Sequence, residues 1–323
     1  MRTMMFVATL PTLDPAGVAE IGAAVRANIK RAVKVSDEVL RDLLVALIAE
    51  GHVLIEDRPG VGKTALARAL ARSLEAEYAR IQCTADLLPS DVIGTNVFNQ
   101  RDARFEFHPG PVFANVVLVD EINRTSPKTQ SGLLECMQEH RVTIDGQTHE
   151  LARPFIVLAT QNPTEYEGTY PLPEAQLDRF MVRVSLGYPS PADEAEMLAD
   201  HAASDRVLEL EPVTDVAMVR AAQAGAAELH ASEEVRRYVV AVCTATRDDP
   251  RVEQGASPRA GLMLFRAAKA HAALEGRDHV LPDDVQALAP SVLGHRLMIA
   301  PDALGGGGAE AVVADALASV PAL

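Results

Sequence analysis

A glycine-rich turn followed by lysine and threonine is the first candidate for chemistry in this chain. The turn comprises Pro59, Gly60, Val61, Gly62, Lys63, Thr64 and Ala65. It follows a short apolar run and opens a segment with helical spacing, which is the context that a phosphate-binding loop requires. Backbone N–H groups of such a loop point at phosphate oxygens, and the helix N-terminus adds a positive partial charge. We predict that Lys63 reaches the β and γ phosphates of a nucleotide and that the Thr64 hydroxyl binds Mg²⁺. An ordinary glycine-rich turn is the alternative.

One position departs from the usual pattern of this loop. Where G-x-x-x-x-G-K-[ST] begins with glycine, this chain has Asp57. Aspartate tolerates left-handed backbone angles better than most residues, so the turn remains feasible. Its carboxylate must then point away from the phosphates.

Two acidic residues at the end of a buried run form the second candidate. Residues 116–119 are all apolar, and Asp120 and Glu121 follow them directly. Such a pair could serve only to cap a turn, but its place downstream of a phosphate-binding loop favours catalysis. We predict that Asp120 holds Mg²⁺ through a water molecule and that Glu121 polarises the attacking water.

These residues need a scaffold that brings them together. Apolar runs of strand length cover residues 52–56, 78–83, 116–120, 155–159 and 181–186. Segments with helical spacing separate several of them, including 63–75 and 127–139. This alternation predicts an α/β fold with a mostly parallel five-stranded sheet covered by helices on both faces.

Two hairpins interrupt this alternation. Residues 97–107 alternate in polarity around a turn, and residues 141–151 carry the turn signal Asp145-Gly146. Beyond residue 189 the chain is rich in alanine, and residues 191–289 contain no convincing strand. We therefore divide the chain into an N-terminal extension (1–14) that we expect to be disordered, an α/β core (15–189) and an all-helical domain (190–323) that ends in a short helix.

Composition makes several function classes unfavourable. The chain has 323 residues, a net charge of −15, no tryptophan and three cysteines, which we expect to pack in the core. An acidic surface repels nucleic acid and anionic membranes, and no apolar run is long enough to span a bilayer. So few cysteines predict a reducing, cytoplasmic location.

A longer series of motifs identifies a family. The motifs are Pro-Gly-Val-Gly-Lys-Thr at 59–64, Gly-Pro-Val-Phe at 110–113, Asp-Glu-Ile-Asn-Arg at 120–124, Pro-Lys-Thr-Gln at 127–130, Leu-Leu-Glu-Cys-Met-Gln-Glu at 133–139, Ala-Thr-Gln-Asn-Pro at 159–163, Leu-Pro-Glu-Ala-Gln-Leu-Asp-Arg-Phe at 172–180 and Ser-Pro-Arg at 257–259. In this order, from about residue 18 to the end, they resemble the AAA+ ATPases and specifically their MoxR family. The resemblance implies Mg²⁺-dependent ATP hydrolysis by an α/β core followed by a helical lid.

The resemblance also implies roles for single residues. Asn162 matches the sensor-1 residue that orients the attacking water, Arg179 matches the arginine finger that reaches a neighbouring subunit's nucleotide, and Arg259 matches sensor 2 on the lid. The alternatives are a turn-capping asparagine, a structural ion pair and a surface arginine at a helix start. The Gly-Gln pair that the family usually carries near adenine is missing here, and backbone contacts from Val35 would take its place.

The family further implies an assembly and a client. The resemblance to MoxR proteins implies a ring, expected to be a hexamer, that remodels or matures proteins with von Willebrand factor A domains. The two hairpins resemble those of the helix-2-insert branch, where they face the pore or substrate, although each could simply cover its own core. A nucleic-acid motor, a chelatase-type motor subunit and a non-motor ATP switch are the alternative functions.

Overall fold

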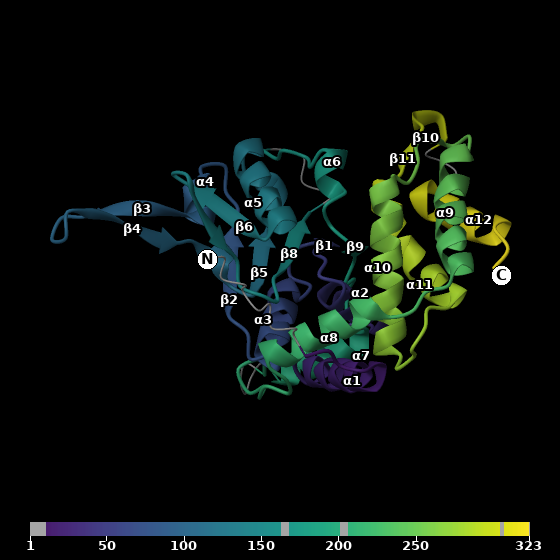
Figure 1. The fold of residues 1–323 in the computed structure, drawn as a ribbon, viewed down its shortest axis with the longest axis horizontal. Coiled ribbons are helices and arrows are strands. Elements are labelled where there is room, and N and C mark those ends of the chain that lie inside the picture. The colour runs from purple at the N-terminus through teal and green to yellow at the C-terminus, as the bar shows by residue number, and fades with distance from the viewer. Residues whose placement is uncertain (1–10, 163–167, 201–205, 304–306, 323) are drawn as a thin grey trace, which may run out of the picture.

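The computed structural model describes residues 11–162, 168–200, 206–303 and 307–322 (Figure 1). Residues 1–10 of the predicted extension and Pro163 of the predicted motif lie outside these ranges. Within the extension, the Leu13 N–H donates to the carbonyl of Ala221 at 3.1 Å. Asp14 accepts from the Gly17 N–H at 2.9 Å and so caps the first helix.

A five-stranded sheet forms the centre of the α/β part. Its strands lie in the order β2-β5-β8-β1-β9, and every neighbouring pair is parallel. Their bounds are β1 (Val53–Glu56), β2 (Tyr78–Gln82), β5 (Val116–Asp120), β8 (Ile156–Gln161) and β9 (Val182–Val184). Each strand overlaps one of the predicted runs, so the predicted sheet is confirmed. The carboxyl ends of all five strands therefore lie at one edge.

Both faces of the sheet are covered by helices. Val116 and Leu118 of β5 belong to one apolar cluster, whereas Val117 and Val119 belong to another, because side chains alternate between the faces of a strand. The first cluster includes residues of α1, α2 and α3, and the second includes residues of α5. These helices are α1 (Pro15–Ala32), α2 (Asp37–Ile48), α3 (Lys63–Ser73) and α5 (Pro127–Glu139).

The two predicted hairpins are present. The first, β3 (Gly94–Asn99) and β4 (Arg104–Pro109), follows the short helix α4 (Pro89–Ile93) and projects from the sheet (Figure 1). The second joins β6 (Arg141–Ile144) to β7 (Gln147–Glu150) through a turn in which both central residues have positive φ.

The C-terminal part is mainly helical. Its helices are α7 (Pro191–Asp200), α8 (Val216–Glu228), α9 (Glu233–Asp248), α10 (Pro258–Leu274), α11 (Pro282–Leu293) and α12 (Gly308–Ser319). One detail of the prediction was wrong, because β10 (Val252–Gln254) forms a two-stranded antiparallel sheet with β11 (Met298–Ile299). Strands of three and two residues are too short to leave an alternating pattern in the sequence.

The N-terminal and C-terminal helices share one apolar core. Val25 of α1 and Leu43 of α2 lie in the same cluster as Val219 of α8 and Leu264 of α10. Short elements complete the connections: α6 (Glu174–Leu177) and the 3₁₀ turns η1 (Pro111–Phe113), η2 (Ile122–Arg124), η3 (Gly294–Arg296) and η4 (Pro301–Ala303). Among the described residues, no helix is long and apolar enough to cross a membrane.

Candidate active site

The glycine-rich turn joins the end of β1 to the start of α3. Gly60 and Gly62 have φ values of 86° and 93°, a left-handed conformation that glycine adopts without steric cost. Gly62 is the N-cap of α3, so Lys63 and Thr64 stand in its first turn. Lys63 Nζ donates to the Asp57 carbonyl at 2.5 Å. The turn thus has the backbone form of a phosphate-binding loop, with the helix N-terminus behind it.

Asp57 fixes the start of this loop. Its Oδ2 accepts from Ser185 Oγ at 3.0 Å and from the Gly187 N–H at 2.8 Å, and its Oδ1 accepts from the Arg58 N–H at 2.9 Å. The carboxylate therefore points to the segment after β9 and away from the loop, as the sequence required. Asp57 does not have the left-handed backbone that we allowed for it.

A threonine organises the acid pair. Thr160 Oγ1 donates to Asp120 Oδ1 at 2.7 Å and accepts from the Glu121 N–H at 2.9 Å. Glu121 itself has φ 58° and ψ 53°, a left-handed conformation that is uncommon outside glycine and is found at functional sites. The hydroxyl of one residue therefore sets both the Asp120 carboxylate and the backbone of Glu121.

Basic and amide side chains surround the two carboxylates. Arg80 donates to Asp120 Oδ2 at 2.6 Å, and Arg124 donates to Glu121 Oε2 at 3.0 Å. Gln82 reaches the same Glu121 oxygen at 3.3 Å. These partners hold the carboxylates at the edge of the sheet where β1 also ends.

The oxygen atoms of Thr64 and Asp120 suit a magnesium ion. Mg²⁺ prefers hard oxygen ligands and usually keeps several waters, so one hydroxyl and one carboxylate are enough protein ligands. Each carboxylate oxygen has two lone pairs, and the bonds from Thr160 and Arg80 leave Asp120 able to accept from a metal-bound water. Among the described residues there is no cluster of three histidine, cysteine or acidic side chains that would hold a different kind of metal.

Asn162 follows β8, which lies between β5 and β1 in the sheet. It is 8% exposed. The Asp57 N–H donates to the carbonyl of the preceding Gln161 at 3.2 Å. Asn162 therefore emerges between the strand that carries the acid pair and the strand that carries the loop.

Arg179 lies away from the loop of its own chain. It lines a surface depression together with residues of α5, β6 and α6, including Glu135, Gln138 and Arg141. Arg259 stands in the first turn of α10, which Ser257 caps by accepting from the Ala260 N–H at 3.1 Å. The Arg259 guanidinium lies 3.8 Å from the carboxylate of Asp178, the residue before Arg179.

A buried arginine that sequence reasoning missed shares Asp178. Arg296 donates to Asp178 Oδ1 at 2.7 Å and to the backbone carbonyls of Phe180 at 2.5 Å and Met181 at 3.2 Å. Its side chain is 2% exposed, and burial lowers the pKa of its guanidinium, although Asp178 raises it. Thr160 and Arg80 were missed as well. For Arg80 the visible signal was a charged residue inside an apolar run. For Thr160 it was a position two residues before Asn162, in the same motif.

Val35 lines a second depression near the loop. Its other walls include Lys34, Leu186 and Tyr188. The Arg58 guanidinium, from the loop, lies 5.8 Å from the centre of the Tyr188 ring and donates to its hydroxyl at 3.3 Å. The position predicted for adenine contact is therefore a neighbour of the phosphate-binding loop.

The three cysteines are buried and unpaired, as predicted. Burial raises the pKa of Cys83 and of Cys136 to about 12, and it also raises the pKa of Cys243. A thiol with so high a pKa supplies little thiolate at neutral pH and is a poor nucleophile.

Comparison with known proteins decides the family. The family described as "ATPase family associated with various cellular activities (AAA)" matches residues 52–182, and the AAA lid domain matches residues 244–316. The chain is 42% identical over 287 residues to the chaperone MoxR1 of Mycobacterium tuberculosis. This alignment covers 86% of this chain and 75% of MoxR1. The chain belongs to the MoxR family of AAA ATPases.

Two further proteins are similar over most of the chain. YeaC of Bacillus subtilis is 51% identical over 278 residues, covering 86% of this chain and 87% of that protein. A solved structure of an ATPase from Cytophaga hutchinsonii has a TM-score of 0.88 and 36% identity, covering 96% of this chain and 97% of the other. The matched core contains Lys63, Glu121 and Asn162, and the matched lid contains Arg259. As a MoxR-family ATPase, the chain binds and hydrolyses ATP.

Proposed function

We propose that this MoxR-family chain hydrolyses ATP with Mg²⁺ in an assembled ring and uses the energy to remodel a partner protein. The observation that carries the catalytic part is the Thr160 hydroxyl that joins Asp120 to the backbone of Glu121 beside the loop-bearing strand. A base, a metal ligand and a phosphate-binding loop at one sheet edge are what phosphoryl transfer to water requires.

Each residue has a defined task in this proposal. Lys63 and the loop N–H groups hold the phosphates, Glu121 takes a proton from the attacking water, and Asn162 orients that water. Thr64 and Asp120 hold Mg²⁺, which would neutralise developing charge on the phosphates. Arg259 ties the lid to the γ phosphate, so the angle between lid and core follows the nucleotide.

The place of Arg179 supports a ring. It lines a surface depression with α5 and β6 instead of pairing with its own loop, and AAA ATPases typically form oligomers. An arginine supplied from a neighbouring subunit stabilises charge in the transition state and is worth roughly 10³-fold or more in rate. Hydrolysis would therefore depend on assembly, which we expect to be hexameric.

The partner role rests on relatives. MoxR1, which carries the name chaperone, covers most of this chain at 42% identity. We expect the clients to be proteins with von Willebrand factor A domains and the location to be the cytoplasm. Glu121→Gln should bind ATP without hydrolysing it, and its stable complex with a von Willebrand factor A-domain protein, absent without ATP, tests this part.

The ring is tested by the ATPase activity of mixed variants. Arg179→Ala and Glu121→Gln should each lose most activity alone, because one lacks the finger and the other lacks the base. Mixing them should restore a fraction of the wild-type rate, since a Glu121 from one subunit then meets an Arg179 from the other. Arg141→Ala, in the same depression, serves as the matched control and should keep its activity. No recovery on mixing, or full activity of Arg179→Ala alone, would refute a finger supplied by a neighbour.

A further inference from the structure

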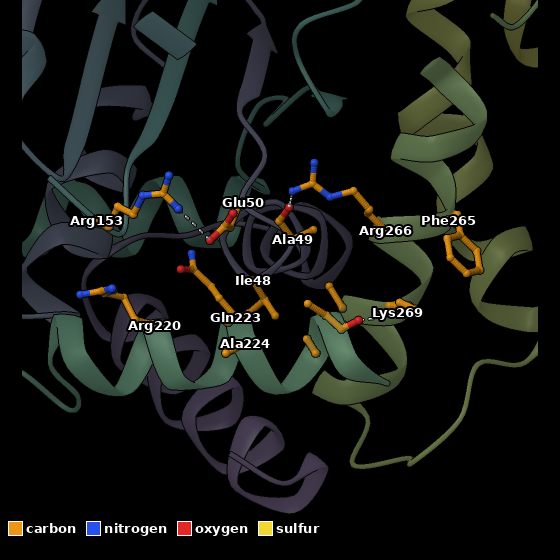
Figure 2. Close-up of a pocket in the computed structure, with 13 residues that line it drawn as sticks. Ile48, Ala49, Glu50, Arg153, Arg220, Gln223, Ala224, Phe265, Arg266 and Lys269 are labelled. Carbon is orange, nitrogen blue, oxygen red and sulfur yellow. Dashed lines mark hydrogen bonds and ion pairs between the residues drawn. The ribbon is translucent and has the colours of Figure 1, made fainter. Parts of the chain in front are cut away.

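A pocket of about 360 Å³ lies beyond the amino ends of the strands, away from the phosphate-binding loop. Its walls come from the end of α2, the residue Arg153 ahead of β8, and the helices α8 and α10 (Figure 2). Residues 48–50 precede β1, whereas the loop follows β1, so the strand separates the two sites. A pocket of this size accommodates a small molecule.

The pocket is strongly cationic in a chain whose net charge is −15. Four basic side chains line it, and one acidic side chain opposes them; they are Arg153, Arg220, Arg266, Lys269 and Glu50. Glu50 Oε1 lies 3.9 Å from Arg153 NH1, at the limit of an ion pair. The balance is three positive charges, and low-dielectric walls strengthen the field that they create.

Two of the basic side chains donate hydrogen bonds to backbone carbonyls at helix ends, and these bonds do not neutralise their charge. Arg266 donates to the Ala49 carbonyl at the end of α2, and Lys269 donates to the Ala227 carbonyl in the last turn of α8 at 2.8 Å. Basic side chains commonly contact the last carbonyls of a helix. A carbonyl satisfies one donor without neutralising the charge. Burial, with Arg236 nearby, lowers the pKa of Lys269.

Arg220 is the cation that the fold itself does not explain. Its guanidinium makes no hydrogen bond or ion pair to another residue in the part of the chain that the structure describes. It stands on α8 one turn before Gln223, whose amide is buried and donates to the Leu47 carbonyl at 2.7 Å. A guanidinium presents a planar fork of donors that matches phosphate or carboxylate oxygens.

Apolar side chains form the rest of the wall. They are Ile48, Ala224, Ala226, Ala270 and the ring of Phe265. We propose that this pocket binds a small organic phosphate, a dianionic monoester whose phosphate lies between Arg153 and Arg220 and whose apolar body lies against these side chains. Because Arg153 precedes a core strand and Arg220 belongs to the C-terminal helices, the ligand would bridge the two parts.

The test uses phenyl phosphate as the probe and isothermal titration calorimetry as the measurement. The full chain is first loaded with one equivalent of ADP and Mg²⁺, so that the phosphate-binding loop is occupied. We expect one further molecule to bind, and we expect Arg153→Ala and Arg220→Ala each to weaken its affinity at least tenfold. Arg237→Ala, on the exposed face of α9, is the matched control and should bind normally.

A gain of affinity provides the sharper criterion. Glu50→Gln removes the acid that lines the pocket and should tighten phenyl phosphate binding severalfold, which a folding defect cannot imitate. The proposal is wrong if no saturable binding occurs, or if Arg220→Ala and Glu50→Gln leave the affinity unchanged. Inorganic phosphate binding as tightly as phenyl phosphate would overturn the organic ligand class, because the apolar wall would then contribute nothing.

Discussion

Thr160 is the residue on which the geometry of the acid pair depends most directly. Its hydroxyl donates to one member and accepts from the backbone of the other. It is fully buried, at 0% exposed, so water cannot replace it without rearrangement. The left-handed backbone of Glu121 therefore relies on a hydrogen bond that only a hydroxyl in this place supplies.

We expect Thr160→Val to lower kcat for ATP hydrolysis about tenfold to a hundredfold, because the Glu121 N–H loses its partner and an unpaired buried donor costs about 1–3 kcal/mol. ATP affinity should change less than about threefold, since the two hydrogen bonds of the Thr160 hydroxyl go to Asp120 and to the Glu121 backbone. Steady-state kinetics and a nucleotide-binding titration separate the two effects. Thr160→Ser keeps the hydroxyl and should keep the rate. Wild-type kcat in Thr160→Val would contradict the role given to the hydroxyl, because valine keeps the methyl group and lacks only that oxygen.

At the scale of the elements, His52 joins the start of β1 to two neighbours. Its Nδ1 accepts from the Val157 N–H of β8 at 3.1 Å, and its Nε2 lies 2.9 Å from the Met137 carbonyl of α5. This pairing requires the neutral ring with the proton on Nε2. Burial lowers the pKa of His52 from its ordinary value of 6.5 to about 4.

This shift predicts a loss of stability in acid. The unfolded chain binds a proton at His52 below pH 6.5, whereas the folded chain resists it until about pH 4, so the free energy of unfolding falls as pH drops through that window. The contribution is about 3 kcal/mol. We expect His52→Gln to be less stable at pH 7.5 but to lose about 3 kcal/mol less than wild type between pH 7.5 and 4. Urea unfolding at several pH values measures this.

The exposed His230 offers the matched control for that series. His230→Gln should follow the wild-type pH profile if the acid sensitivity comes from His52. Parallel profiles for wild type and His52→Gln would show that the acid sensitivity arises elsewhere.

At the scale of the whole molecule, Arg296 links the C-terminal helices to the segment before β9. It comes from η3, after α11, and contacts Asp178, Phe180 and Met181. Arg259, from α10, approaches the same Asp178 carboxylate. The acid next to the predicted finger is thus shared by two arginines of the C-terminal part.

Removing Asp178 alone should lower the free energy of unfolding more than removing Asp178 and Arg296 together. Asp178→Asn leaves the buried guanidinium of Arg296 without its counter-charge, and we expect it to lower the free energy of unfolding by about 3–5 kcal/mol. Adding Arg296→Met to that variant should recover part of the loss, because the uncompensated charge is gone. A double-mutant cycle with urea unfolding measures the coupling. Additive losses would mean that the two side chains stabilise the fold independently.

Much of this architecture could be predicted from local patterns. The apolar run at 116–120 became β5, and the segment at 127–139, with Ser126 before it and Pro127 at its start, became α5 at the same residues. Such segments are readable because a strand end, a helix cap and a loop each depend on neighbours in the chain. The phosphate-binding loop and the acid pair were readable for the same reason.

What could not be predicted depends on register between distant segments. Arg80 meets Asp120 only because β2 pairs with β5 so that Gln82 lies opposite Asp120, which places Arg80 nearby. Thr160 meets Asp120 across β8 and β5, and Arg296 meets Asp178 across more than a hundred residues. No spacing within one segment encodes these contacts. The pairing of β10 with β11 also joins distant segments, and both strands are too short to leave an alternating pattern.

The carboxylate of Asp57 also bears on the thermodynamics of nucleotide capture. A glycine at this position would leave the first residue of the loop free to sample many backbone conformations. Binding of a phosphate would then have to restrict that residue to one conformation, at a cost in entropy. Here three hydrogen bonds immobilise that residue before any ligand enters. The conformational entropy of Asp57 is therefore lost during folding and not during nucleotide binding, so the phosphate-binding loop is preorganised.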